Sequence, residues 1–385
     1  MKKRTKILIA VLIVFLILAA AAGVFIWHKF SLINTVKLDK EQLQTASEKN
    51  ATADEPEQEE EELPTGYQMI ALVGLDTRDG AGANNSDTMI IAMIDHDTKS
   101  IKLVSLYRDT YLNVIQDYYK NPDYYTKANA AYNYGGPEQF LSMLNLNLDL
   151  DIEDFITVDF KALTEVIDLM GGLDIDMTRE ELIHLNNYNV ETSEAAGVEY
   201  EEIEVPDASV FDGAMQRTFH LTGSQAVSYA RIRYTAGYDY RRTARQRLVI
   251  EKVLEKAKTM DLSVLNYVLE KALPYVTTNM DGWTIMNLMQ NVLTYDVTEE
   301  TGFPFDHVGQ NVGSLDAVIP VTLETNVIKL HEFLFPGQYY TPSSTVKEYS
   351  DHIIGDTGLG EESIPEHSES GALPDYDPGY DVENE

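Results

Sequence analysis

The chain concentrates arginine in one short segment. Six arginines lie between residues 231 and 247, and they are Arg231, Arg233, Arg241, Arg242, Arg245 and Arg247. The alternation of the first two is typical of a strand that points both side chains to one face. A guanidinium group is a planar fork that binds phosphate or carboxylate oxygens in pairs. In a protein of formal net charge -34, such a cluster predicts a bound anion, with an internal network of salt bridges as the alternative.

The spacing within this segment separates arginines expected to face inward from arginines expected to face solvent. If residues 242–258 form a helix, its apolar stripe continues through Arg242 and Gln246 toward the helix N-terminus. We expect this end of the stripe to meet a cleft. Arg245 and Arg247 flank the stripe and fit a solvated charged surface. The residues of the segment expected to point inward are therefore Arg231, Arg233, Arg242 and Gln246, and they need either an anionic ligand or carboxylate partners.

Acidic residues stand at the ends of two neighbouring predicted strands. Asp76 follows one apolar run, and Asp87 precedes the next. A chain reversal can bring the two carboxylates together, and oxygen ligands without histidine or cysteine suit Mg²⁺. Capping of turns by aspartate is the alternative. Arg108 and Asp109 follow a third predicted strand, so they should reach the same sheet edge if these strands pair.

Other reaction classes lack their signatures. The chain has no GxxxxGK[ST] nucleotide-binding motif, no HExxH zinc motif and no GxSxG nucleophile elbow. It contains no cysteine, which excludes disulfides and thiolate metal sites, and its eight histidines show no ligand spacing. The acidic balance argues against nucleic acid as a partner, because phosphate backbones bind basic surfaces.

The remaining sequence predicts the scaffold that positions these groups. Five apolar runs predict strands, the second and third as a hairpin: 69–75, 88–95, 101–106, 155–159 and 173–177. Helical spacing occurs in 136–144, 162–170 and 242–258 and in two patterns within 262–293. Thr222 or Ser224 is expected to cap a further helix that leads to Tyr229. This mixture predicts an α/β fold, a three-layer α-β-α domain with a mixed central sheet, over residues 67–341. The glutamate-rich residues 178–212 are expected to form a surface insertion.

Both ends are expected to lie outside that domain. Residues 7–27 are apolar and uncharged, which suffices for a single transmembrane helix across a core of about 30 Å. The preceding basic residues predict a cytoplasmic tail at 1–6 and an extracellular remainder; a cleaved signal peptide is the alternative. Acidic, low-complexity sequence predicts a disordered stalk at 28–66 and a disordered tail at 342–385.

Six segments together resemble the LytR–CpsA–Psr (LCP) family of bacterial cell-envelope proteins. They follow in the family's order and span most of residues 68–255. No single segment is specific, but the set is. The segments are Val73-Gly-Leu-Asp-Thr-Arg78, Ser86-Asp-Thr-Met89, Val104-Ser-Leu-Tyr-Arg-Asp-Thr110, Lys127-Ala-Asn-Ala-Ala-Tyr132, Leu221-Thr-Gly-Ser-Gln-Ala-Val-Ser-Tyr-Ala-Arg-Ile-Arg233 and Arg242-Thr-Ala-Arg-Gln-Arg247.

This resemblance implies a phosphotransferase that moves a glycopolymer, such as teichoic acid or capsular polysaccharide, from undecaprenyl pyrophosphate to a peptidoglycan acceptor. It also implies a single-pass protein of the bacterial cell membrane with an extracellular catalytic domain. Asp76 and Asp87 would hold Mg²⁺ with the pyrophosphate, and Asp87 or Asp109 would act as general base. The phosphates would be held by Arg78, Arg108, Arg231, Arg233, Arg242 and Gln246. Candidate lining for the polyprenyl tail, or alternatively ordinary core, is Leu141, Leu144, Val166, Ile167 and Met170.

Two positions depart from the family's pattern. Asn85 stands where the family usually has arginine, so one phosphate contact is lost or is supplied by Arg241. Tyr107 replaces a common proline. The alternative functions are a polyprenyl-pyrophosphate hydrolase and a non-catalytic polyprenyl-phosphate binding or sensing protein. Retention of Asp76 and Asp87 favours an enzyme.

Overall fold

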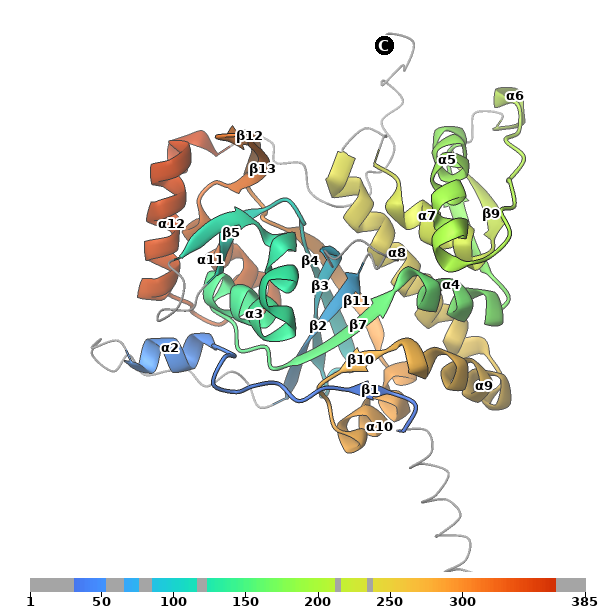
Figure 1. The fold of residues 1–385 in the computed structure, drawn as a ribbon, viewed down its shortest axis with the longest axis horizontal. Helices are drawn as coiled ribbons and strands as arrows, with labels where there is room; N and C mark the ends of the chain where they lie inside the picture. Colours follow the sequence, from blue (N-terminus) through green and yellow to red (C-terminus); the bar gives the residue numbers. More distant parts are fainter. Residues whose placement is uncertain are drawn as a thin grey trace, which may run out of the picture.

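A seven-stranded mixed sheet forms the centre of the computed structural model, which describes residues 31–52, 66–75, 85–115, 123–211, 216–233 and 238–364 (Figure 1). In spatial order the strands are β1 (Asn34–Thr35), β10 (Thr277–Thr278), β7 (Asp154–Asp159), β2 (Tyr67–Leu75), β3 (Ser86–Asp95), β4 (Ser100–Leu106) and β11 (Asp296–Phe303). β2 is parallel to β7 and antiparallel to β3, and β3 is antiparallel to β4. The predicted hairpin and the predicted mixed sheet are both confirmed.

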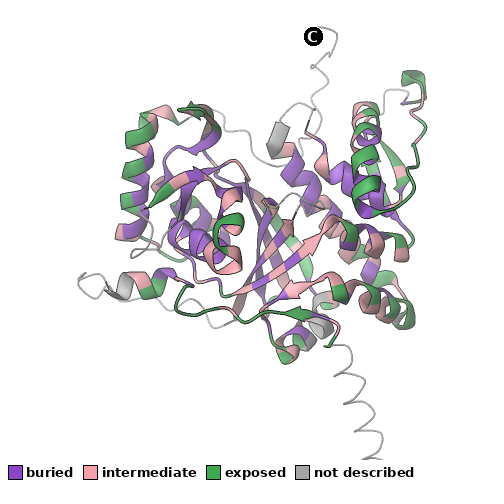
Figure 2. Cartoon of the chain, in the orientation of Figure 1, coloured by how far each residue is buried: buried purple, intermediate pink, exposed green. Residues whose placement is uncertain are grey.

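Helices bury both faces of this sheet. Alternate residues of β3 serve different hydrophobic clusters, with Met89 and Ile91 on one face and Ile90 and Ile94 on the other, as the twofold repeat of a strand requires. The first face is covered by α3 (Ala131–Leu148), α11 (Leu323–Leu334) and α12 (Ser344–Thr357). The second is covered by α8 (Tyr238–Thr259), the short helix η2 (Leu273–Tyr275) and α10 (Gly282–Asn291). The three-layer prediction holds, and Figure 2 shows the middle strands of the sheet as largely buried.

A second, smaller cluster of buried side chains lies beside the sheet. It joins α4 (Phe160–Leu169), α5 (Arg179–Ala196) and α7 (Gly223–Arg231) to the two-stranded sheet of β8 (Leu173–Met177) and β9 (Arg217–Leu221). The predicted strand at 173–177 therefore exists but pairs outside the central sheet. α7 lies so close to α4 that a Cβ on Gly223 would overlap the Thr164 carbonyl. This contact fixes the N-terminal end of α7, and Arg231 lies at the other end of the same helix.

The other elements are short or peripheral. They are α2 (Ala46–Thr52), β5 (Tyr111–Ile115), β6 (Tyr124–Lys127), η1 (Ala128–Ala130), α6 (Ala208–Phe211), α9 (Leu262–Ala272), η3 (Val292–Thr294), β12 (His307–Val312), β13 (Leu315–Pro320) and η4 (Glu361–Ser363). The helical spacing predicted over 262–293 is confirmed as α9 and α10.

Two predicted boundaries are wrong. The disordered tail at 342–385 contains α12, in which Val346, Tyr349 and Ile353 are spaced for one helix face and are buried in the core. The disordered stalk at 28–66 contains residues 31–52, with Ile33 and Leu43 buried. Residues 178–212, predicted as a surface insertion, contain α5, which buries Leu182 and Leu185. In each of these segments the acidic composition concealed a few apolar residues whose spacing allows them to be buried.

The predicted cytoplasmic tail and transmembrane helix, residues 1–27, lie outside the described residues. Within the described residues, no helix combines the length and apolar character needed to cross a membrane.

Candidate active site

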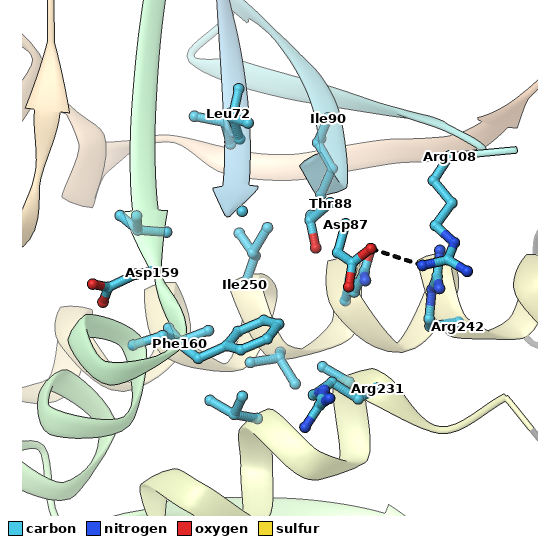
Figure 3. Close-up of a pocket in the computed structure, with 18 of the residues that line it drawn as sticks. Leu72, Asp87, Thr88, Ile90, Arg108, Asp159, Phe160, Arg231, Arg242 and Ile250 are labelled. Carbon is cyan, nitrogen blue, oxygen red and sulfur yellow. Dashed lines mark hydrogen bonds and ion pairs between the residues drawn. The ribbon is translucent and has the colours of Figure 1, made fainter. Parts of the chain in front are cut away.

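A cavity of about 980 Å³ lies between the central sheet and helices α4, α5, α7 and α8 (Figure 3). One part of its lining is apolar and comes from β2, β3, β7 and the facing helices, including Leu72, Ile90, Ile156, Phe160, Leu163 and Ile250. The other part is polar and contains Asp87, Arg108, Asn129, Arg231, Arg233, Arg242 and Gln246. Asp87 and Gln246, which are 159 positions apart in the chain, thus line the same cavity.

A β-bulge brings Asp87 to this cavity. Gly74 pairs with Thr88 but the next residue, Leu75, pairs with Ser86, so Asp87 is an extra residue in β3. Regular alternation would put Asp87 and Thr88 on opposite faces, whereas both line the cavity. A bulge re-aims a side chain in this way. Gly74 allows the close approach, because a Cβ there would lie 2.9 Å from the Cβ of Thr88.

Arg108 holds the Asp87 carboxylate. Its Nη1 donates to Asp87 Oδ1 at 2.7 Å (Figure 3). Burial alone would raise the pKa of Asp87, but the positive charges of Arg108, Arg242 and Arg233 outweigh it and lower that pKa below its usual value. Asp87 is therefore an ionised carboxylate set among guanidinium groups.

The pKa of Asp87 leads to a testable pH dependence. Because the folded pKa lies below the unfolded one, stability from ionised Asp87 is complete above about pH 4 and is lost as pH falls through the folded pKa. A ¹³C carboxyl NMR titration should place the pKa of Asp87 below that of an exposed aspartate, and Arg108→Ala should raise it. A wild-type pKa at or above the exposed reference would contradict this electrostatic assignment.

Arg231 is held at the junction of the polar and apolar parts. Its Nη1 donates to Thr192 Oγ1 at 2.7 Å, and its Nη2 lies 3.4 Å from Glu191 Oε2. The guanidinium carbon lies 5.0 Å from the centre of the Phe160 ring and 5.8 Å from that of Tyr188. These are cation–π distances. Arg231 is the last residue of α7, so the predicted strand through Arg231 and Arg233 is wrong, although both line the cavity.

Arg245 and Arg247 are buried, which corrects their predicted position on a solvated surface. Both side chains have 0% exposure. Arg245 lies 2.9 Å from Glu181 Oε1 through Nη2 and donates from Nη1 to the Ile232 carbonyl at 3.1 Å. This hydrogen bond therefore fixes the position of the Ile232 carbonyl, which lies between Arg231 and Arg233 in the chain. Arg247 Nε lies 3.4 Å from Glu300 Oε2. For these two arginines, the structure supports the alternative of an internal network of salt bridges.

The acidic candidates differ in position. Asp109 lies 3.5 Å from Arg108 Nε and 3.4 Å from Lys127 Nζ, and is not among the cavity-lining residues that the structure describes. Asp76 and Arg78 fall outside the described residues. Within the described ranges no group of three acidic, histidine or cysteine side chains is arranged to hold a metal ion. The one candidate metal ligand placed here is Asp87.

Comparison with known proteins agrees with the resemblance that the six sequence segments carry. A family model described as the LytR_cpsA_psr family matches residues 35–315. The chain belongs to the LytR_cpsA_psr family. The predicted resemblance is thereby confirmed, and the matched range begins well before the predicted start of the domain at residue 67.

Two relatives of this LCP protein have names that describe different roles, one a regulatory protein and the other a transferase. Biofilm regulatory protein A of Streptococcus mutans is 32% identical over 290 residues, which cover 73% of this chain and 63% of that protein. The polyisoprenyl-teichoic acid–peptidoglycan teichoic acid transferase TagU of Halalkalibacterium halodurans is 27% identical over 189 residues, covering 49% and 52%. The chain thus matches less than two thirds of the length of these relatives.

Solved structures share the fold. Protein gbs0355 of Streptococcus agalactiae is 22% identical, with a TM-score of 0.56 over 76% of this chain and 96% of that one. TagV of B. subtilis is also 22% identical, with a TM-score of 0.53 over 73% of this chain and 100% of that one.

One wall of the LCP cavity was missed by sequence analysis. His184, Asn187, Tyr188 and Glu191 of α5 line it, and their spacing of three and four residues places them on one helix face. Their polar character gave no signal that this face meets a cavity. Conversely, the candidate tail-lining residues lie in the hydrophobic clusters and not in the described cavity lining, so the ordinary-core alternative was right: Leu141, Leu144, Val166, Ile167 and Met170.

The two departures from the family pattern have defined places. Asn85 lines the cavity, whereas Arg241 is absent from its described lining. Tyr107 is 1% exposed and meets His307 edge-on at 5.4 Å. A Cβ on Gly302 would overlap the Tyr107 hydroxyl, so the larger side chain is accommodated by a glycine on β11.

Proposed function

We propose that this protein transfers a glycopolymer of the teichoic acid or capsular type from undecaprenyl pyrophosphate to peptidoglycan. The observation that carries the proposal is the cavity itself, which is large enough for a hydrocarbon chain. Its apolar lining adjoins an end rich in arginine that contains the ionised carboxylate of Asp87. An amphiphile with a long hydrocarbon tail and a pyrophosphate group matches both parts. The name of the related TagU protein, a teichoic acid transferase, supports the same substrate class.

The arginines would bind and stabilise the phosphates. Phosphoryl transfer depends mainly on positioning and on neutralising charge that develops on the phosphate oxygens. Arg231 lines the cavity from the end of α7, Arg233 from the segment just after α7, Arg242 from α8 and Arg108 from the segment that follows β4. We assign the pyrophosphate to the space among them, with Gln246 and Arg78 as further ligands.

Mg²⁺ is proposed as the cofactor, held by Asp87 and Asp76. Asp87 fits this role because it faces the cavity and is ionised at neutral pH, and Asp76 directly follows the end of β2. Asp87 would hold the ion together with Asp76 while Oδ1 of Asp87 accepts from Arg108. When bound, Mg²⁺ supplies positive charge to the pyrophosphate oxygens.

The proton of the acceptor hydroxyl is assigned to Asp87. Of the two carboxylates considered as general base, Asp87 lines the cavity. Asp109 is not among the lining residues that the structure describes and lies between Arg108 and Lys127. As the acceptor oxygen bonds to the phosphorus of the glycan phosphate, the bond to the lipid phosphate breaks and the proton passes to Asp87. Asp109 positions Arg108 and Lys127.

The decisive experiment uses the full chain in detergent micelles with a glycan linked to polyprenyl pyrophosphate. Acceptor-dependent, Mg²⁺-dependent release of polyprenyl phosphate, with glycan appearing on peptidoglycan fragments, is the expected result. Release at the same rate without acceptor would replace the transferase with a hydrolase. Tight lipid binding with no release under any condition would replace it with a binding or sensing protein.

The location belongs to the same proposal. Residues 7–27 would form a single transmembrane helix, with residues 1–6 in the cytoplasm and the catalytic domain on the extracellular side. The lipid-linked donor is then available in the membrane to which the enzyme is attached.

A substitution in the apolar lining should separate tail binding from phosphate binding. Val158 lies on β7 and lines the cavity with Ile156, two residues earlier on the same strand face. Val158→Phe should narrow the cavity and weaken binding of a long polyprenyl pyrophosphate by about ten-fold, or roughly 1.4 kcal/mol, with inorganic pyrophosphate binding unchanged. Val190→Phe on the exposed side of α5 (55% exposed) is the matched control. Equal binding of the long lipid by both variants would remove the tail from this cavity.

A further inference from the structure

A set of exposed apolar side chains lies at the end of the domain where the described chain begins. Trp283 of α10 is 75% exposed, and Tyr267 and Val264 of α9 are 51% and 42% exposed. We call these three residues the α9–α10 face. Single exposed apolar residues are ordinary on a protein surface, so their meaning depends on where this face lies.

Helix α10, which carries Trp283 of the α9–α10 face, adjoins the first described residues of the chain. Leu32 and Ile33 pack in the same hydrophobic cluster as Ile285 and Leu288 of α10. β1 extends from there and pairs with β10, with Asn34 N donating to the Val276 carbonyl at 3.0 Å. In Figure 1, β1, α9 and α10 occupy one end of the molecule. The start of the chain is thus fixed to this end by side-chain packing and by backbone hydrogen bonds.

Chain length places this end near any membrane that residues 7–27 cross. Four peptide units connect Trp27 to Ser31, and they reach at most about 14 Å at roughly 3.6 Å per residue. A linker this short cannot hold the domain away from a bilayer. Whatever lies beside β1 must therefore lie close to the lipid headgroups.

The side chains of the α9–α10 face point outward and suit an interface. Ile285 is buried, and Trp283, two residues earlier and about 200° around the helix, is on the opposite side. On α9, Val268 is buried while Tyr267 is exposed, with Lys271 Nζ 5.8 Å from the Tyr267 ring. Tryptophan and tyrosine concentrate at membrane interfaces, and lysine can extend from there into water.

We propose that the α9–α10 face rests on the headgroup region of the bilayer that the N-terminal segment crosses. This inference depends on the membrane anchor in the proposed function and adds an orientation to it. α4 connects the face to the cavity, because Phe160 and Leu163 line the cavity while Val166 packs in one cluster with Leu265 and Val268 of α9. The docked orientation places the apolar cavity lining one helix away from the lipid surface.

The two tryptophans of the chain permit a direct test. In Trp27→Phe, emission comes from Trp283 alone. The full chain is reconstituted in phosphatidylcholine–phosphatidylglycerol vesicles with brominated acyl chains. An interfacial side chain lies about 5–10 Å into the headgroup boundary, so emission of Trp283 should fall by about half relative to unbrominated vesicles and should resist aqueous acrylamide.

The control moves the probe to the far end of the molecule. The variant Trp27→Phe, Trp283→Phe, Val210→Trp carries its tryptophan on α6, at the opposite end from β1 and α10 in Figure 1, and should show no lipid quenching. A chain that floats with vesicles but shows unquenched Trp283 would overturn docking and leave the anchor intact. A chain that does not float would overturn both. Acceptor-dependent release by the same preparations reports separately on the proposed function.

Discussion

Replacing Asp87 by asparagine should lower Mg²⁺-dependent glycan transfer by about a hundred-fold or more. Asparagine keeps the shape of the side chain and an oxygen that accepts from Arg108 Nη1, now 2.7 Å from Asp87 Oδ1. It removes the negative charge proposed to hold the metal and to take the proton. Binding of polyprenyl phosphate should persist, because the arginines remain and lose a competing anion.

Asp95→Asn is the matched control for this variant. Asp95 stands at the other end of β3, where its Oδ1 accepts from the backbone nitrogens of Asp97 and Thr98 at 2.8 and 3.0 Å. Its amide can preserve those bonds and it faces no part of the cavity. We expect near-normal transfer by Asp95→Asn, measured as initial rates at saturating donor with both variants folded by circular dichroism. Transfer by Asp87→Asn within a few-fold of wild type would remove Asp87 from the chemistry.

The second large effect is on stability, at the buried pair of Glu181 and Arg245. The two side chains are 7% and 0% exposed, and Arg245 Nη2 and Nε lie 2.9 and 3.0 Å from Glu181 Oε1. Glu181→Gln should reduce the free energy of unfolding by about 3–5 kcal/mol, because it leaves a buried guanidinium without its countercharge. Glutamine can still accept from Thr178 N, as Glu181 Oε2 does at 2.9 Å, so the helix cap of α5 is retained.

An exposed ion pair elsewhere provides the comparison. Lys252 and Glu255 lie 2.9 Å apart on α8 with 34% and 54% exposure, and Glu255→Gln should cost less than about 1 kcal/mol. Urea denaturation of the two single variants measures the difference. Replacing Glu181 and Arg245 together by leucine and methionine should recover most of the loss. A cost for Glu181→Gln as small as that of Glu255→Gln would show that the pair is solvated in solution.

Glu181→Gln should also reduce the transfer activity of the protein that remains folded. Arg245 donates to the Ile232 carbonyl, between two arginines of the cavity. Loss of its countercharge is expected to loosen that peptide and to raise the KM for the donor, with a smaller change in kcat.

Sequence determined the layers of the fold and much of the polar end of the site. Apolar runs of five to eight residues predicted β2, β3, β4 and β7, and these strands stand close to their predicted limits. The stripe through Arg242 and Gln246 leads to the cavity because helical periodicity is a local property. The order of six short segments determined the family.

Tertiary structure alone decided which surfaces meet. Helical periodicity predicts that Arg242 and Arg245 lie on different sides of α8, but it does not predict what packs on each side. The side that carries Arg245 is buried because Glu181 of α5 packs against it. The bulge at Asp87 depends on the pairing of β2 with β3. The polar face of α5 became a cavity wall, and the acidic C-terminal segment became a core helix, because distant apolar residues cover them. Burial is a relation between segments, and spacing within one segment does not contain it.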